Sequence, residues 1–144
     1  MPTRFVKCDL LRLAVATCVL TAFTLHRAIA EEAPIASGQQ TNGKARAEIL
    51  SLKRTEADTL TLRFAIANED NRDLSITISN MQLVDLVNRR IYKPGVESNS
   101  CRIPAGERKV CWAIFGAPNA SVRTLNVKFY EDFDLIPVQI TGAN

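Results

Sequence analysis

Residues 59–66 alternate between polar and apolar side chains, and this period of two is the feature that most constrains the fold. The apolar members are Leu60, Leu62, Phe64 and Ile66. Because successive side chains of a β-strand point to opposite faces, the pattern predicts a strand that buries these four side chains against a core. A partner strand is expected just before it, at residues 47–53.

The same short-strand pattern continues towards the C-terminus. Further strands are expected at residues 74–78, 81–87, 90–92, 109–115, 125–129 and 133–140. Pro137 favours an edge position for the last of them, since proline lacks the donor that an inner strand needs. No segment after residue 30 predicts a helix. We therefore expect an all-β fold over residues 45–144, an antiparallel immunoglobulin-like β-sandwich of seven to eight strands, with a small closed barrel as the alternative.

The first 30 residues predict a cleavable secretory signal peptide. Basic side chains precede an apolar run at residues 13–25, and small residues lead to an expected cleavage site between Ala30 and Glu31. The run has about 13 residues, fewer than the ~20 that a membrane helix needs, so we expect no stable span in the mature form. Export to the periplasm or out of the cell follows. Residues 31–44 are polar and rich in turn formers, which predicts a flexible tail.

The net charge of +3 belongs entirely to the predicted signal. Residues 1–30 hold four basic side chains and one acidic one, so 14 of each remain in the mature chain. A near-neutral chain lacks the positive charge that nucleic-acid binding needs, and we expect no nucleic-acid partner. The one histidine, His26, also lies in the signal. Its removal excludes Ser-His-Asp and Cys-His catalysis and histidine-containing zinc sites, and we predict no catalytic residue, metal or cofactor.

Two cysteines, Cys101 and Cys111, remain after the signal. An oxidising compartment favours a disulfide between them. Gly106 lies halfway between them in a turn sequence, which predicts a hairpin with the two cysteines as direct cross-strand neighbours. A redox-active pair is the alternative, but such pairs usually lie two residues apart at a helix start. Trp112 follows on the neighbouring face and is predicted to pack in the core, with an exposed aromatic contact to a partner as the alternative.

Two acid-rich segments are candidates for chemistry. The loop that carries Asp70 and Asp73 offers oxygen ligands for calcium, but it lacks the ordered spacing of a calcium-binding hand loop. A solvated turn is therefore the favoured interpretation, and calcium binding by this loop is the alternative. The second segment contains Glu131, Asp132 and Asp134. Paired carboxylates can serve as acid and base in glycoside cleavage, although neighbouring residues at a strand end point in different directions.

Arg89, Arg90 and Tyr92 are the candidate partner contact. Together with Lys93 and Arg102 they form an expected basic patch that could recognise a carboxylate or a phosphate. A charged sheet edge that discourages aggregation is the alternative interpretation.

An ordered series of short motifs runs through the second half of the chain. It comprises Asp85-Leu86, Arg90-Ile91-Tyr92, Cys101, Pro104-Ala105-Gly106-Glu107 and the segment 111–118. The series resembles poorly characterised exported β-sandwich domains of bacterial envelope proteins, over roughly residues 46–140. Some of those domains are fused to outer-membrane-protein-A-like domains that bind the cell wall. The resemblance implies a β-sandwich in the envelope and carries over no catalytic residue.

These observations favour an exported, non-enzymatic interaction or accessory module of the bacterial envelope, with a protein or an envelope component as its partner. One alternative is an enzyme or enzyme inhibitor that acts on envelope polymers through the carboxylate cluster at residues 131–134. The other is a calcium-binding domain. A partly apolar exposed patch near Tyr92 or Trp112 would favour the interaction module.

Overall fold

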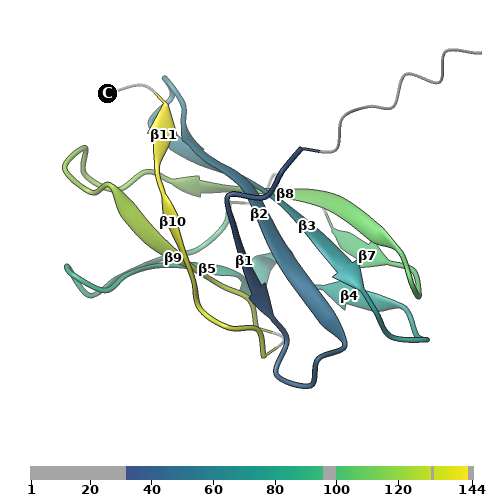
Figure 1. The fold of residues 1–144 in the computed structure, drawn as a ribbon. Coiled ribbons are helices and arrows are strands. Elements are labelled where there is room, and N and C mark those ends of the chain that lie inside the picture. The colour runs from purple at the N-terminus through teal and green to yellow at the C-terminus, as the bar shows by residue number, and fades with distance from the viewer. Residues whose placement is uncertain (1–31, 96–99, 131, 143–144) are drawn as a thin grey trace, which may run out of the picture. The chain divides into compact units, whose positions relative to one another are not determined.

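The structure, a computed structural model, describes residues 32–95, 100–130 and 132–142. These residues form two β-sheets packed face to face and a short two-stranded sheet beside them (Figure 1). Their regular elements are eleven strands and one short 3₁₀ helix, η1 (Ile78–Asn80), and the described part contains no α-helix. The predicted signal peptide and the expected cleavage site between Ala30 and Glu31 lie outside the described residues.

One sheet has five strands and is built on a long hairpin. Its strands are β1 (Ala36–Gln39), β2 (Ala45–Arg54), β3 (Thr59–Asn68), β8 (Arg108–Gly116) and β11 (Thr141–Gly142). The order is β1-β2-β3-β8, all antiparallel, and β11 pairs with β2 in parallel. The β2–β3 register shifts between Ile49 and Ser51, so β2 carries a bulge-like irregularity at Leu50.

The second sheet has four antiparallel strands in the order β10-β9-β5-β6. They are β5 (Gln82–Asp85), β6 (Arg90–Tyr92), β9 (Thr124–Lys128) and β10 (Ile136–Gln139). A separate short pair joins β4 (Leu74–Ile76) to β7 (Cys101–Ile103). The chain leaves the first sheet after β3, returns with β8 and crosses again to β9. This alternation of hairpins between two sheets is the pattern of an immunoglobulin-like sandwich.

The predicted alternation places the core correctly. All four apolar side chains of the opening pattern in β3 are fully buried. Phe64 meets Phe129, the residue directly after β9 of the opposite sheet, edge-to-face, with ring centroids 5.3 Å apart. Aromatic pairs in this geometry add to the stability that burial of their area provides. Pro137 lies on β10, an edge strand of the four-stranded sheet, as its missing donor indicates.

The sandwich begins earlier than the sequence suggests. Within the segment predicted to be a flexible tail, β1 pairs with β2, and Gly38 lies opposite Ala47. A Cβ atom on Gly38 would lie 2.6 Å from Cγ1 of Ile136, so only glycine permits this close approach to β10. This strand contributes backbone hydrogen bonds to the sheet rather than an apolar face, so no apolar alternation marks it in the sequence.

Candidate interaction surfaces

The disulfide between Cys101 and Cys111 is present, but not in the expected hairpin. Both cysteines are fully buried, and their Cα atoms are 5.9 Å apart. Cys101 pairs with Ile76 of β4, whereas Cys111 lies opposite Phe64 of β3. The predicted turn at Gly106 exists, but β7 pairs with β4 instead of β8. The disulfide therefore ties the β4–β7 pair to the five-stranded sheet.

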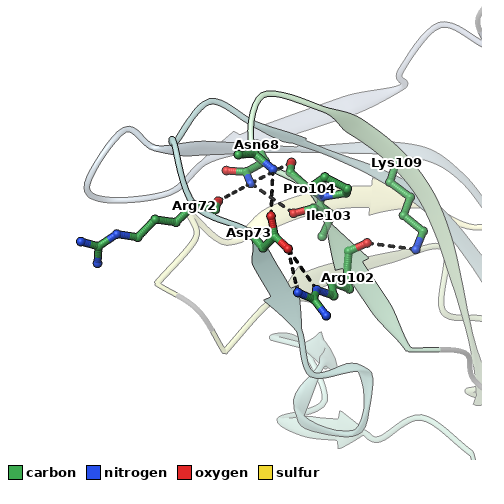
Figure 2. Close-up of polar contacts among 8 residues, drawn as sticks. Asn68, Arg72, Asp73, Arg102, Ile103, Pro104 and Lys109 are labelled. Carbon is green, nitrogen blue, oxygen red and sulfur yellow. Dashed lines mark hydrogen bonds and ion pairs between the residues drawn. The ribbon is translucent and has the colours of Figure 1, made fainter.

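A buried amide joins the loop after β3 to the end of β7 (Figure 2). The Nδ2 group of Asn68 donates hydrogen bonds to the carbonyl oxygens of Arg72 at 2.8 Å, Ile103 at 3.2 Å and Pro104 at 3.1 Å. Asn68 is almost fully buried, so these bonds satisfy donors that would otherwise be lost from water. They hold the acid-rich loop in one place.

The two aspartates of this loop are bound to cations of the same chain. A guanidinium nitrogen of Arg102 lies 2.8 Å from Asp73 and lowers the pKa of that carboxyl, while Lys44 lies 3.1 Å from Asp70 and lowers its pKa. No group of three acidic, histidine or cysteine side chains that could hold a metal occurs among the described residues. A calcium ion at either carboxylate would compete with the cation that is bound there. Arg102 was expected in the patch around Tyr92, but it belongs to β7 of the short β4–β7 sheet and pairs with Asp73.

The described residues of the second acid-rich segment accept hydrogen bonds from β1 and from Thr41, which follows it. Thr41 donates hydrogen bonds from its backbone N–H and its hydroxyl to the carbonyl oxygen of Asp132, at 2.9 and 2.8 Å. The carboxylate of Asp134 accepts a hydrogen bond from the backbone N–H of Gln39 at 3.3 Å. Glu131 lies outside the described residues. The contacts of Asp132 and Asp134 therefore join β1 to the segment before β10.

The turn between β5 and β6 is held by a buried carboxylate. One oxygen of Asp85 accepts hydrogen bonds from the backbone N–H groups of Val87 and Asn88, both at 3.0 Å. The other oxygen accepts one from the Asn88 side chain at 2.7 Å. The bonds from Asn88 contribute most to lowering the pKa of Asp85. Asp85 is only 2 % exposed, so its carboxylate orders the turn and is not offered to a ligand in solvent.

This hairpin brings apolar and basic side chains together at its tip. Leu86, Val87 and Ile91 are 62, 89 and 58 % exposed. Arg89 and Arg90, both predicted as partner contacts, are exposed beside them. The third predicted contact, Tyr92, is half-buried and packs against the core opposite Leu83. Tyr92 therefore anchors β6. We call residues 86–91 the hairpin tip.

A hollow of about 250 Å³ lies beside the hairpin tip. It is lined by Asn88, Arg90, Tyr92, Asn119, Ser121 and Val122. The last three belong to the loop between β8 and β9, and Figure 1 shows that loop and the loop after β5 leaving the sandwich at the same end. The lining offers a guanidinium, amides and hydroxyls, which are groups that bind anionic oxygen atoms.

Trp112 lies on the outer face of the five-stranded sheet, so its predicted place in the core is wrong. Its neighbours Cys111 and Ala113 face the core, and alternation directs Trp112 outward. Trp112 is 36 % exposed and Val110, on the same face of β8, is 43 % exposed. Arg63 of β3 lies directly opposite Trp112. The signal for this placement was the alternation itself.

A buried carboxylate organises the arginines of the same outer face. Glu48 of β2 lies 2.9 Å from guanidinium nitrogens of both Arg46 and Arg108. It shares a cross-strand row with Ala65 and Val110. We call this surface the Trp112 face; it consists of Arg46, Glu48, Arg63, Arg108, Val110 and Trp112. Since two of its three arginines share one carboxylate, the surface retains a net positive charge.

The segment before β1 crosses the Trp112 face (Figure 1). Its Ile35 donates a backbone hydrogen bond to the carbonyl oxygen of Ile49 at 2.8 Å, and Glu32 lies 2.7 Å from Arg63. A hollow of about 280 Å³ lies between this segment and Glu48. The Trp112 face is therefore partly covered by this segment and has a hollow beside it, so it is not a flat sheet surface.

The two face-to-face sheets and the hairpins that alternate between them define an antiparallel, immunoglobulin-like β-sandwich, so the predicted fold class is confirmed. The described residues contain eleven strands where seven to eight were expected, because several short strands carry no apolar alternation of their own. The solved structure of MPT63, a secreted protein from Mycobacterium tuberculosis, is similar to this chain, with a TM-score of 0.51 and 12 % sequence identity. The similarity covers 72 % of this chain and 89 % of MPT63. At this identity it shows the fold alone.

No protein-family model matches the sequence. No curated protein sequence matches it either. Among the described residues, none of the helical segments has the length and apolar character required to cross a membrane.

Proposed function

We propose that this protein is an exported, non-enzymatic interaction module of the bacterial envelope that binds a protein or another envelope component through the Trp112 face. The observation that carries the proposal is the exposed Trp112 beside Val110 and Arg63, outside the core. Tryptophan and arginine are enriched among the residues that dominate binding energy at protein interfaces.

Four observations support the envelope location. The sequence predicts a signal peptide cleaved between Ala30 and Glu31, and the Cys101–Cys111 disulfide suits an oxidising compartment. The fold is similar to that of a protein described as secreted. The motif series also resembles exported envelope domains, some of which are joined to cell-wall-binding domains. The near-neutral mature chain argues against nucleic acid as the partner.

The test is affinity capture from native envelope extract with the exported chain as bait. The wild type and Trp112→Ser are compared, with Tyr130→Ser as the matched control, because Tyr130 is an exposed aromatic outside the Trp112 face. We expect the captured partner to bind Trp112→Ser about thirtyfold more weakly, which corresponds to about 2 kcal/mol for an interface hot spot, and to bind Tyr130→Ser normally.

Trp112 also provides a direct readout, since it is the only tryptophan of the chain. Burial of its indole by a partner should shift its fluorescence emission to shorter wavelength. Equal binding by Trp112→Ser and wild type, with no emission shift in the wild type on binding, would rule out the Trp112 face as the partner surface.

A further inference from the structure

The hairpin tip has a shape and chemistry that the partner surface on the opposite sheet does not explain. We propose that this tip docks onto an anionic lipid surface, with Leu86 and Val87 entering the boundary between headgroups and acyl chains. The inference concerns a second surface and goes beyond the binding proposed for the Trp112 face.

The tip presents its apolar side chains on an ordered turn. Val87, at the apex, is the most exposed large apolar side chain among the described residues, at 89 %. The hydrogen bonds from Val87 and Asn88 to Asp85 hold the turn in this form before any contact is made. A turn that is already ordered loses little conformational entropy on docking, and its affinity is higher for that reason.

The charges around the tip complement an anionic surface. Residues 86–95 contain three basic side chains, Arg89, Arg90 and Lys93, and no acidic one. The nearest carboxylate along the chain, Asp85, is turned inward to bind the loop. Basic side chains next to exposed apolar ones are the arrangement by which peripheral proteins bind membranes that contain anionic lipid.

The hollow beside the tip extends this complementarity. Arg90 lies in its wall together with Asn119 and Ser121 of the neighbouring loop. When Leu86 and Val87 reach the acyl boundary, this wall faces the headgroup layer, where phosphate oxygens accept hydrogen bonds from guanidinium and amide groups. The tip and the hollow would thus contact adjoining layers of the same surface.

A lipid surface fits the tip better than a protein partner does. A stable protein interface covers roughly 800 Å² and 20–30 residues on each partner. The apolar part of the tip consists of three side chains on a protruding turn, which is far smaller. A bilayer needs no complementary pocket, because an apolar apex can sink about 5–10 Å into its interface.

The experiment is flotation of the exported full chain with vesicles of phosphatidylcholine alone, and with vesicles in which about one third of the lipid is phosphatidylglycerol. We expect the wild type to float with the anionic vesicles and to be released by salt, since salt screens surface charges. The double variant Leu86→Ser/Val87→Ser should bind at least about tenfold more weakly than the wild type. Arg89→Gln/Arg90→Gln should bind about thirtyfold more weakly, because each basic residue near such a surface contributes roughly fivefold.

Controls separate this inference from the proposed function. Leu135→Ser, an apolar-to-polar change on another exposed segment, should float like the wild type. Trp112→Ser should also float normally, and the emission of Trp112 should not shift with vesicles. The inference would be overturned if the folded wild type did not float with anionic vesicles, or if the tip variants floated like the wild type. So would self-association that the tip variants abolish, because the tip would then be an interface between two copies.

Discussion

Reduction of the Cys101–Cys111 disulfide should release the β4–β7 pair from the five-stranded sheet. The two strands of this pair have three residues each, and their ladder comprises three residue pairs. Cys101 sits at one end of that ladder, opposite Ile76. Without the covalent bond, β7 keeps hydrogen bonds to the five-stranded sheet from Asn68 to Ile103, at the end away from Cys101, and from Lys109 to the carbonyl oxygen of Arg102. The end near Cys101 should open first.

The expected size follows from the loop that the bond closes. The cysteines are 10 residues apart, and closing a loop of this length stabilises the folded state by about 3 kcal/mol in the chain-entropy model. For a domain of about this size, such a loss lowers the melting temperature by roughly 12 °C or more. Both sulfur atoms are buried, so the reductant acts through transient opening or unfolding.

The assay is urea denaturation with and without reductant, together with hydrogen exchange. Reduction should lower the unfolding free energy by about 3 kcal/mol and should raise exchange in β4 and β7 before β2 and β3. The variant Cys101→Ala/Cys111→Ala should not respond to reductant. A loss below about 1 kcal/mol, or two free thiols in the exported protein, would refute the reasoning.

Three further changes test the packing and the charges. Folding lowers the pKa of Asp85 from 3.8, so its ionised carboxylate stabilises the fold above pH 3.8, and this stabilisation is lost as the pH falls through the lower pKa of the folded state. Between about pH 7 and about pH 2, Asp85→Asn should therefore lose less unfolding free energy than the wild type in urea titrations. Equal losses in the two proteins would contradict this. Glu48→Ala removes the carboxylate beside Arg108 and should cost about 2 kcal/mol of unfolding free energy, a figure reduced for partial exposure; a change near zero would show that the pair is screened. Gly38→Ala should cost about 2 kcal/mol by crowding Ile136, and unchanged melting would mean that β10 moves freely.

Much of the core could be predicted because side-chain direction within a strand is a local property. The opening alternation assigned Phe64 and its three apolar neighbours in β3 to the core face, where they lie. The same rule directs Trp112 outward once Cys111 and Ala113 face inward. The core prediction for Trp112 followed its size and not its position in the strand.

Apart from the predicted pairing of β2 with β3, the pairing of strands was decided only by the tertiary structure. β1 carries no apolar pattern, and its place depends on hydrogen bonds to β2 and on the contact of Gly38 with Ile136. Arg102 was grouped with Arg89 and Arg90 by sequence, but β7 pairs with β4 and brings it to Asp73. Local patterns determine which face of a strand is apolar; they do not determine its neighbours, since the backbone groups that join strands are nearly the same in every residue.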